Sequence, residues 1–221
     1  MSRPHEDREK HTPVDHRPGG EPLFFASGTW CAIDVAHAKT DRSQAAISSY
    51  ETLIEQARTT SAKARSSAVF SSDNGRRVVA IIELGGHEGF RHLETAWNDH
   101  HRYAEHRVKD ESSVLELYRV LEGAGGVSID PDSHTKYAIE RVAHEPARAD
   151  ALTTAISGQA GFLGVIVFGK DDDTRSIILY WFETREALES ARTSEAVQRV
   201  LGPLGETGES FFLAHLVKTF E

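Results

Sequence analysis

Apolar and polar positions follow two periods along this chain, and the two periods occur in a fixed order. Short runs rich in Val, Ile, Phe and Tyr, bounded by turn residues, predict strands. Apolar residues three and four positions apart predict helices with one buried face, as in the run from Ala46 to Ala57 that follows the N-cap candidate Ser43. In the first half, the predicted strands cover residues 24–36, 66–70, 77–84 and 113–121, and the second predicted helix covers residues 88–107.

The second half shows the same order of elements. Its predicted strands cover residues 137–143, 164–169, 175–182 and 210–220, and its predicted helices cover residues 147–157 and 186–201. A shift of 98 positions places Phe70 on Phe168 and Arg77 on Arg175, and the apolar pattern continues without a gap over more than fifty residues. Because a repeat of this length is a complete small domain, we expect two related folding units in tandem.

The composition divides the chain into four segments. Residues 1–22 contain four prolines among dense charge and are expected to form a disordered N-terminal arm. Residues 23–122 and 136–221 are the two repeats, and the glycine-rich residues 123–135 are the linker. The β-α-β-β-α-β order of each repeat is that of the ferredoxin-like unit. The predicted fold class is therefore α+β, with two ferredoxin-like repeats that bury their sheet faces against each other and form a barrel within one chain.

The segment from Tyr180 to Leu188 joins an aromatic-ended strand to a helix through a short acidic turn. In this junction and in its paired β-α-β-β-α-β units, the chain resembles the antibiotic biosynthesis monooxygenase (ABM) family of the dimeric α+β barrel superfamily. The resemblance covers residues 24–220 as two copies, a fused version of what is usually a homodimer. It implies a small-molecule site between each sheet and its helices. Members of this group include cofactor-free oxygenases of polyphenolic or polyketide substrates, and relatives that bind or degrade haem.

One pattern of that family does not transfer to this chain. Many members carry a tryptophan at a strand end and a histidine about nine residues later, and Trp97 and His106 have this spacing. The repeat register, however, aligns Leu84 with the strand end Phe182, which places Trp97 in the middle of a helix. We therefore carry no catalytic residue over from the family.

Histidines distinguish the first repeat from the second. Five of them have no histidine at the matching position of the second repeat: His87, His92, His100, His101 and His106. Helical periodicity places His100 in the apolar stripe that contains Trp97, and His101 at the edge of this stripe. We expect His100 in the cleft between helix and sheet. There it could act as a general base, ligate haem iron, or be a core-edge histidine hydrogen-bonded to a carbonyl or water.

Strand residues supply further candidates. Trp30 and Asp34 share one side of their strand, and Glu116 and Tyr118 share one side of theirs, because side chains alternate along a strand. An acidic residue on an interior face is costly unless it is paired, so each either reaches solvent or marks a polar pocket. The predicted site has His100 and Trp97 as catalytic residues, with Trp30, Asp34, Tyr118 and His101 as substrate-binding residues. The second repeat offers Tyr137, Tyr180, Trp181 and His215 as alternatives, and the aromatic residues of both repeats could instead be barrel core.

Composition excludes several classes of function. With 34 acidic against 25 basic residues, the chain lacks the basic stripe that a nucleic-acid partner requires. No apolar run approaches the roughly 18 residues of a membrane helix, and the first residues lack the apolar core of a signal peptide. Cys31 is the only cysteine, which rules out an internal disulfide, and we find no zinc-ligand spacing. A cytoplasmic protein without a metal site is the expectation.

These features lead to two hypotheses for function. The first is an ABM-like monooxygenase, or a related cyclase, that acts without a cofactor on an aromatic, polyketide-type molecule, with His100 as proton acceptor and Trp97 orienting the substrate. The alternative is a haem-binding or non-catalytic protein that holds a small hydrophobic ligand. In both cases the partner is a small molecule rather than a nucleic acid or a membrane, and the fused unit could form a homodimer.

Overall fold

The computed structural model describes residues 23–39, 42–59, 64–102, 115–125, 128–129, 135–143, 146–170, 172, 175–201 and 211–220. The predicted N-terminal arm and His106 lie outside these residues. The first repeat consists of β2 (Trp30–His37), α1 (Ser43–Thr59), β3 (Ala64–Ser72), β4 (Arg77–Leu84), α2 (His87–Arg102) and β5 (Glu116–Gly125). The second consists of β7 (Lys136–Ala143), α3 (Pro146–Ser157), β8 (Phe162–Lys170), β9 (Arg175–Phe182), α4 (Arg185–Thr193), α5 (Glu195–Leu201) and β10 (Phe211–Phe220).

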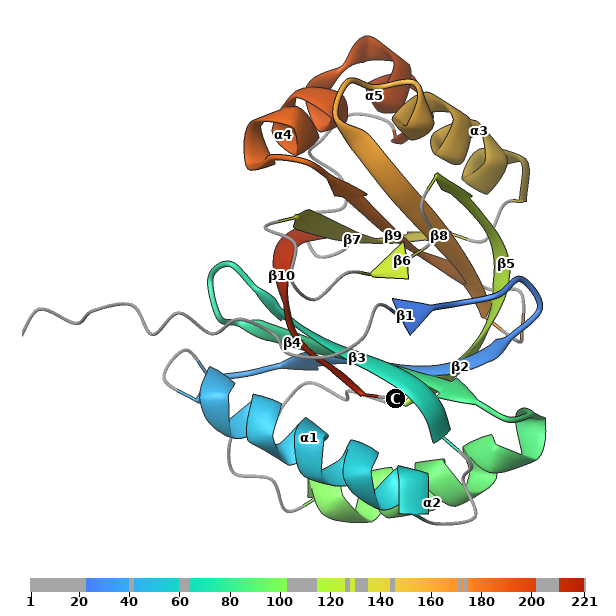
Figure 1. Cartoon of the computed structure of the whole chain (residues 1–221), viewed down its shortest axis with the longest axis vertical. Helices are drawn as coiled ribbons and strands as arrows, with labels where there is room; N and C mark the ends of the chain where they lie inside the picture. Colours follow the sequence, from blue (N-terminus) through green and yellow to red (C-terminus); the bar gives the residue numbers. More distant parts are fainter. Residues whose placement is uncertain are drawn as a thin grey trace, which may run out of the picture.

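The strands of both repeats form one closed antiparallel barrel. Its order is β10-β3-β4-β2-β5-β8-β9-β7, so each repeat contributes four consecutive strands. The repeats join at two seams, where β5 pairs with β8 and β10 pairs with β3. Figure 1 shows the helices of the two repeats on opposite outer sides, with the strands between them. The predicted α+β fold of two ferredoxin-like repeats in an intramolecular barrel is confirmed.

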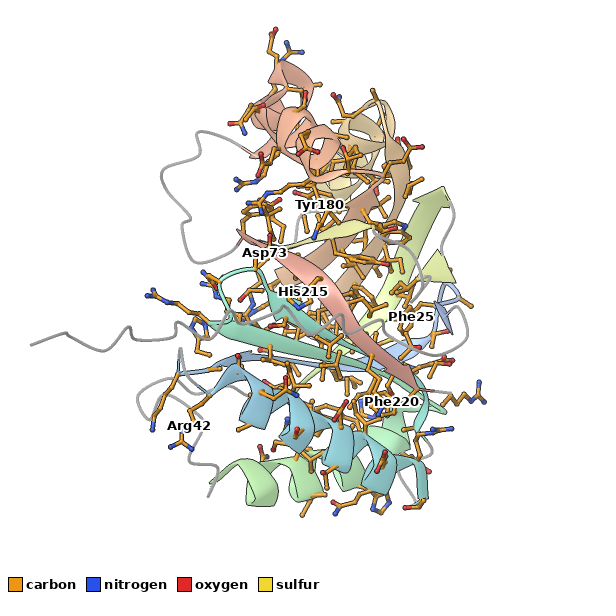
Figure 2. The ribbon with its side chains drawn as sticks, turned by 60° about the vertical axis from the view of Figure 1, so that its left-hand side comes forward. Phe25, Arg42, Asp73, Tyr180, His215 and Phe220 are labelled. Carbon is orange, nitrogen blue, oxygen red and sulfur yellow. The ribbon has the colours of Figure 1, made fainter. Side chains whose placement is uncertain are left out.

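Three apolar cores hold these layers together. The inner core fills the barrel with inward-facing residues from both repeats, including Phe70, Tyr118 and Phe168. The other two cores lie between each half of the barrel and its own helices. Two short strands, β1 (Leu23–Phe24) and β6 (Ser128–Ile129), pair with each other. The adjacent Phe25 packs into the inner core with its ring centroid 6.0 Å from that of Phe168, and Figure 2 shows its position.

The structure departs from the predicted element boundaries at three places. The segment predicted as one strand over residues 24–36 is interrupted by a turn at Gly28, which has a φ of 84°, a conformation that favours glycine. Strand β5 continues through Gly125, so the first residues of the predicted linker pair with β8. The helix predicted over residues 186–201 is two helices, because Ser194 has extended backbone between them. None of the described helices is long and apolar enough to span a lipid bilayer.

Candidate functional site

A buried carboxylate lies at the centre of the helix-facing side of the first repeat. Asp34, on β2, has 0% relative exposure. Its Oδ2 atom accepts a hydrogen bond of 2.7 Å from Trp97 Nε1 and one of 2.8 Å from the Tyr50 hydroxyl. The Tyr50 and Trp97 rings also contact each other, with centroids 5.2 Å apart. Asp34, Tyr50 and Trp97 are called the inner triad below.

The sequence explains why these three side chains meet. Alternation along β2 turns Ala32, Asp34 and Ala36 toward the helices, and the two small neighbours leave room beside the carboxylate. Tyr50 belongs to the buried face of α1, together with Ala46 and Leu53. Trp97, on α2, is 1% exposed and reaches the same point from the second helix. One strand and two helices therefore fix the position of the carboxylate.

The energetics of the inner triad favour a fixed geometry. A buried carboxylate loses its hydration, so it must be compensated by donors within the protein. Charge-assisted hydrogen bonds of 2.7–2.8 Å supply such compensation and are stronger than bonds between neutral groups. Both donors are electrically neutral side chains. The inner triad therefore combines a buried acidic group with two aromatic rings at one position between sheet and helices.

A second group of residues forms the accessible rim of this face. Trp30 lies on the same side of β2 as Asp34 and is half-buried. The guanidinium of Arg119, on β5, lies over the Trp30 ring at 5.7 Å from its centroid, within cation–π range. His87, at the start of α2, meets the ring edge-on at 5.6 Å. The rim of Trp30, His87 and Arg119 therefore presents an aromatic surface, a cation and an imidazole where solvent reaches them.

The structure brings some of the predicted site residues together and separates others. Trp97 and Asp34, which are 63 positions apart in the sequence, are in direct contact, and Trp30 lies on the same face. Tyr118 lies on the opposite face of the sheet, inside the barrel, where its hydroxyl donates to Glu116 Oε2 at 2.8 Å. A ligand on the helix-facing side therefore does not contact Tyr118. His100 and His101 belong to α2, but their side chains lie outside the described residues.

Sequence reasoning missed Tyr50 and the rim residues His87 and Arg119. Tyr50 lies within the run from Ala46 to Ala57 that predicts the apolar face of a helix, and its ring is buried there, but a buried hydroxyl needs a polar partner. A buried hydroxyl on the helix and an acidic residue on the strand that the helix covers were the two signals available. Arg119 carried no comparable signal, because its contact with Trp30 depends on the pairing of β2 with β5.

The second repeat holds a carboxylate at the equivalent position. Asp34 pairs with Ala80 and Glu140 pairs with Ile178, and these two partners are related by the repeat shift of 98 positions. Glu140 is buried and accepts a hydrogen bond of 3.2 Å from the Tyr180 hydroxyl. Burial, and then the charge of Glu140, raises the pKa of Tyr180. Figure 2 places Tyr180 close to the helices of the second repeat.

A cation acts on the polar pair of the second repeat. The positive charge of Arg192, on α4, opposes the rise in the pKa of Tyr180, so this guanidinium acts on the same polar group. Arg192 also lies over the Phe211 ring, with 3.2 Å between the guanidinium carbon and the ring centroid. Arg192 therefore lies beside the pair of Tyr180 and Glu140.

Comparison with known proteins gives matches in structure only. No family model matches the sequence, and no curated protein matches it. An anthrone oxidase-like protein is similar over 90% of this chain and 95% of its own, with a TM-score of 0.65 and 15% identity. A proposed monooxygenase from Fusobacterium nucleatum is similar over 87% of this chain and 93% of its own, with a TM-score of 0.56 and 10% identity.

A mutant chlorite dismutase from Candidatus Nitrospira defluvii, solved in complex with cyanide, is similar over 87% of this chain and 92% of its own, with a TM-score of 0.52 and 12% identity. All three similarities extend over nearly the whole of each compared chain, at sequence identities that show the fold alone. Together with the strand order, they establish that this chain has the dimeric α+β barrel fold, with both halves of the barrel formed by one polypeptide.

Proposed function

We propose that this chain is a cofactor-independent monooxygenase, or a related cyclase, that acts on an aromatic, polyketide-type molecule at the helix-facing side of the first repeat. The similarity of its fold to that of an anthrone oxidase-like protein supports this class of reaction. The observation that carries the location is the inner triad, in which a fully buried carboxylate lies between two aromatic side chains.

The reaction balances without an external reductant. A base removes a proton from an activated CH₂ group between phenolic rings, and the substrate anion transfers an electron to O₂. Combination of the two radicals gives a hydroperoxide on that carbon. Loss of water then leaves a ketone, so one oxygen atom enters the product and the other leaves as water with the two hydrogens. The protein must supply a proton acceptor, an orienting surface and a dry environment.

The first repeat offers these three functions along β2 and α2. His100 lies one helical turn after Trp97 on α2, and we assign it the role of proton acceptor. Asp34 fixes the indole of Trp97 and, through it, the turn of α2 that precedes His100. Asp34 and Trp97 are in this sense positioning residues.

The rim supplies the surface on which the substrate binds. An aromatic substrate can stack on the half-buried Trp30, and a phenolate oxygen can pair with the Arg119 guanidinium. These contacts lie at the start of α2, about 20 Å along the helix before His100. They would therefore hold the distal part of an extended substrate, where Arg119 can pair with a phenolate oxygen.

The proposal is tested by oxygen uptake with anthrone as the probe substrate and formation of anthraquinone as the product. We expect His100→Ala to lower kcat/KM by about 10²-fold, the contribution of a typical general base. We expect Asp34→Asn to lower kcat/KM by about tenfold or more, because Trp97 and the turn of α2 before His100 lose their alignment. Glu140→Gln removes the charge of the equivalent carboxylate in the second repeat and is the matched control, with turnover expected to stay within about twofold of wild type.

Three outcomes would contradict parts of this proposal. Full turnover in the His100→Ala variant would remove His100 as the proton acceptor. Equal losses in Asp34→Asn and Glu140→Gln would remove the assignment to the first repeat. A folded protein that consumes no oxygen with anthrone, and that shows a Soret band after incubation with haem, would instead favour the ligand-binding alternative.

Two described histidines of α2, His87 and His92, are not placed as haem ligands. On the described part of α2, His87 contacts the Trp30 ring and His92 is exposed, so neither presents a ligand from an apolar wall. We therefore derive no step of the reaction through haem.

A further inference from the structure

A cluster of charged residues lies at one end of the barrel, on strands β5, β7, β8 and β9. Glu116 Oε1 lies 3.2 Å from Lys170 Nζ and 3.5 Å from an Arg175 nitrogen. Its Oε2 atom lies 3.5 Å from an Arg141 nitrogen and accepts the 2.8 Å hydrogen bond from Tyr118. Glu116, Tyr118, Arg141, Lys170 and Arg175 are called the barrel-end cluster below.

The barrel-end cluster belongs to the inner face of the barrel. Strand alternation places Arg141 on the side of Ile139, Lys170 on the side of Phe168, and Arg175 on the side of Ile177. These three apolar neighbours are members of the inner core, as is Tyr118. The cluster is therefore separated from the inner triad by the thickness of the sheet. It is distinct from the site proposed above.

Cationic groups exceed anionic groups in this cluster. Among the described residues, three cations surround the carboxylate of Glu116, and the additional pair between Lys170 and Asp172, at 2.9 Å, leaves one net positive charge. This excess occurs in a chain whose formal net charge is −9. Burial and the charge of Glu116 raise the pKa of Tyr118, which keeps its hydroxyl protonated as a donor. A local positive site on an acidic protein attracts small anions selectively.

The cations of the barrel-end cluster are accessible. The side chains of Arg141 and Arg175 are 41% and 40% exposed, although their strands belong to a closed barrel. Each approaches Glu116 only to 3.5 Å through one nitrogen, so the other guanidinium donors are available for a second acceptor. A guanidinium presents its donors as a planar fork that fits the oxygens of a carboxylate or phosphate.

Two of the three cations have no counterpart at the other end of the barrel. The repeat relation maps Lys170 to Ser72 and Tyr118 to Ala214 at the other end of the barrel, since Tyr118 pairs with Lys170 and Ala214 pairs with Ser72. It maps Arg141 to Val35, because their partners Ile177 and Val79 are equivalent. Arg175 corresponds to Arg77, so one cation is present at both ends. The cations at the positions of Arg141 and Lys170 are specific to this end of the barrel.

We propose that the barrel-end cluster binds the oxyanion group of a small molecule, a carboxylate or a phosphate, through Arg141, Lys170 and Arg175. In the absence of ligand, the Glu116 carboxylate pairs with the same cations that the oxyanion would contact. The ligand binds at the exposed end of the barrel and does not enter the interior, because large side chains such as Phe168 fill it.

The test measures thermal stability and calorimetric binding of the full chain with inorganic phosphate and with succinate, against sodium chloride at matched ionic strength. A ligand that binds the native state raises its stability in proportion to its concentration relative to Kd, whereas chloride reports screening alone. Saturable stabilisation by phosphate alone, or by succinate alone, supports the proposal and identifies the oxyanion. No stabilisation beyond that given by chloride overturns it.

Variants distinguish a binding site from a purely structural ion-pair network. Arg175→Gln is expected to weaken Kd about tenfold, through loss of a charge-assisted hydrogen bond. Arg199→Gln is the control, because Arg199 is exposed and pairs with Glu195 on α5, away from the barrel end. Glu116→Gln is expected to tighten Kd about tenfold by removing the competing carboxylate. Equal affinities in all three variants would overturn the proposal, and if Arg175→Gln does not fold, Glu116→Gln decides alone.

Discussion

At the scale of the residue, Asp34 shows how one buried charge can organise a whole layer. Its carboxylate has no exposure, and two of its partners come from different helices. Because the charge cannot be left without donors, the positions of Tyr50 on α1 and Trp97 on α2 are coupled to each other through Asp34. The equivalent Glu140 takes its tyrosine from a neighbouring strand instead, so duplication kept the acid and changed its partners.

Removal of one donor to Asp34 tests this coupling. We expect Trp97→Phe to lower the free energy of unfolding by about 1–3 kcal/mol, because the Asp34 carboxylate loses a hydrogen bond while it stays buried. Tyr50→Phe is the closest comparison, since it also removes one donor and keeps a ring of similar size. Urea unfolding followed by far-UV circular dichroism measures both. Wild-type stability in the Trp97→Phe variant would show that the hydrogen bond from the indole N–H to Asp34 does not contribute to the free energy of unfolding.

At the scale of the element, one seam between the repeats carries a titratable contact. His215, on β10, lies 3.8 Å from a carboxylate oxygen of Asp73, in the turn between β3 and β4. Arg185, at the start of α4, approaches the same carboxylate to 3.1 Å. Figure 2 shows Asp73 and His215 close together, where the two halves meet. Partial burial, aided by Lys136, lowers the pKa of His215, and Asp73 opposes this shift.

The lowered pKa gives a pH dependence of definite sign. The unfolded chain takes up a proton at His215 more readily than the native chain does, so acidification favours unfolding. The contribution of His215 to stability is therefore complete above its ordinary pKa, near 6.5, and declines as the pH falls through the native value. We expect NMR titration to give a pKa below 6.5. The fall in urea midpoint between about pH 7.5 and pH 5.5 should be smaller in His215→Gln than in wild type.

The limits of sequence reasoning also lie mainly at the level of elements. The repeat, the order of the elements and the barrel could be predicted from the sequence, because they depend on the hydrophobic period and on local turns. The break at Ser194 could not be predicted, because the helix is interrupted at one residue while the apolar pattern on both sides stays helical. Alternation placed Trp30 with Asp34 and Glu116 with Tyr118, but it does not say which face meets the second sheet. Tyr118 was predicted to bind substrate together with Trp30 and Asp34, whereas it lies on the opposite face of the sheet. The barrel-end cluster, which depends on the register across four strands, was not predicted.

At the scale of the whole molecule, fusion of the two repeats has a consequence for how the chain unfolds. The inner core contains residues of both repeats, among them Phe70 on β3 and Phe168 on β8. The seams between the repeats are continuous strand pairs, β5 with β8 and β10 with β3. Neither repeat can unfold without exposing the inward face of the other to water. The layers between sheets and helices, in contrast, belong to one repeat each.

We therefore expect one cooperative unfolding transition for both repeats. Phe168→Ala removes a fully buried ring from the shared inner core and should cost about 3–5 kcal/mol. This loss should lower the unfolding midpoint of the whole chain, even though Phe168 belongs to the second repeat. Calorimetric and van't Hoff enthalpies should agree, and tryptophan fluorescence from Trp30 and Trp97 in the first repeat should report the same shifted midpoint as Trp181 in the second.

Two transitions, with only the second repeat destabilised, would mean that the barrel core does not couple the halves. Leu152→Ala, in the layer under α3, provides the comparison, because a shared transition must shift for that variant as well.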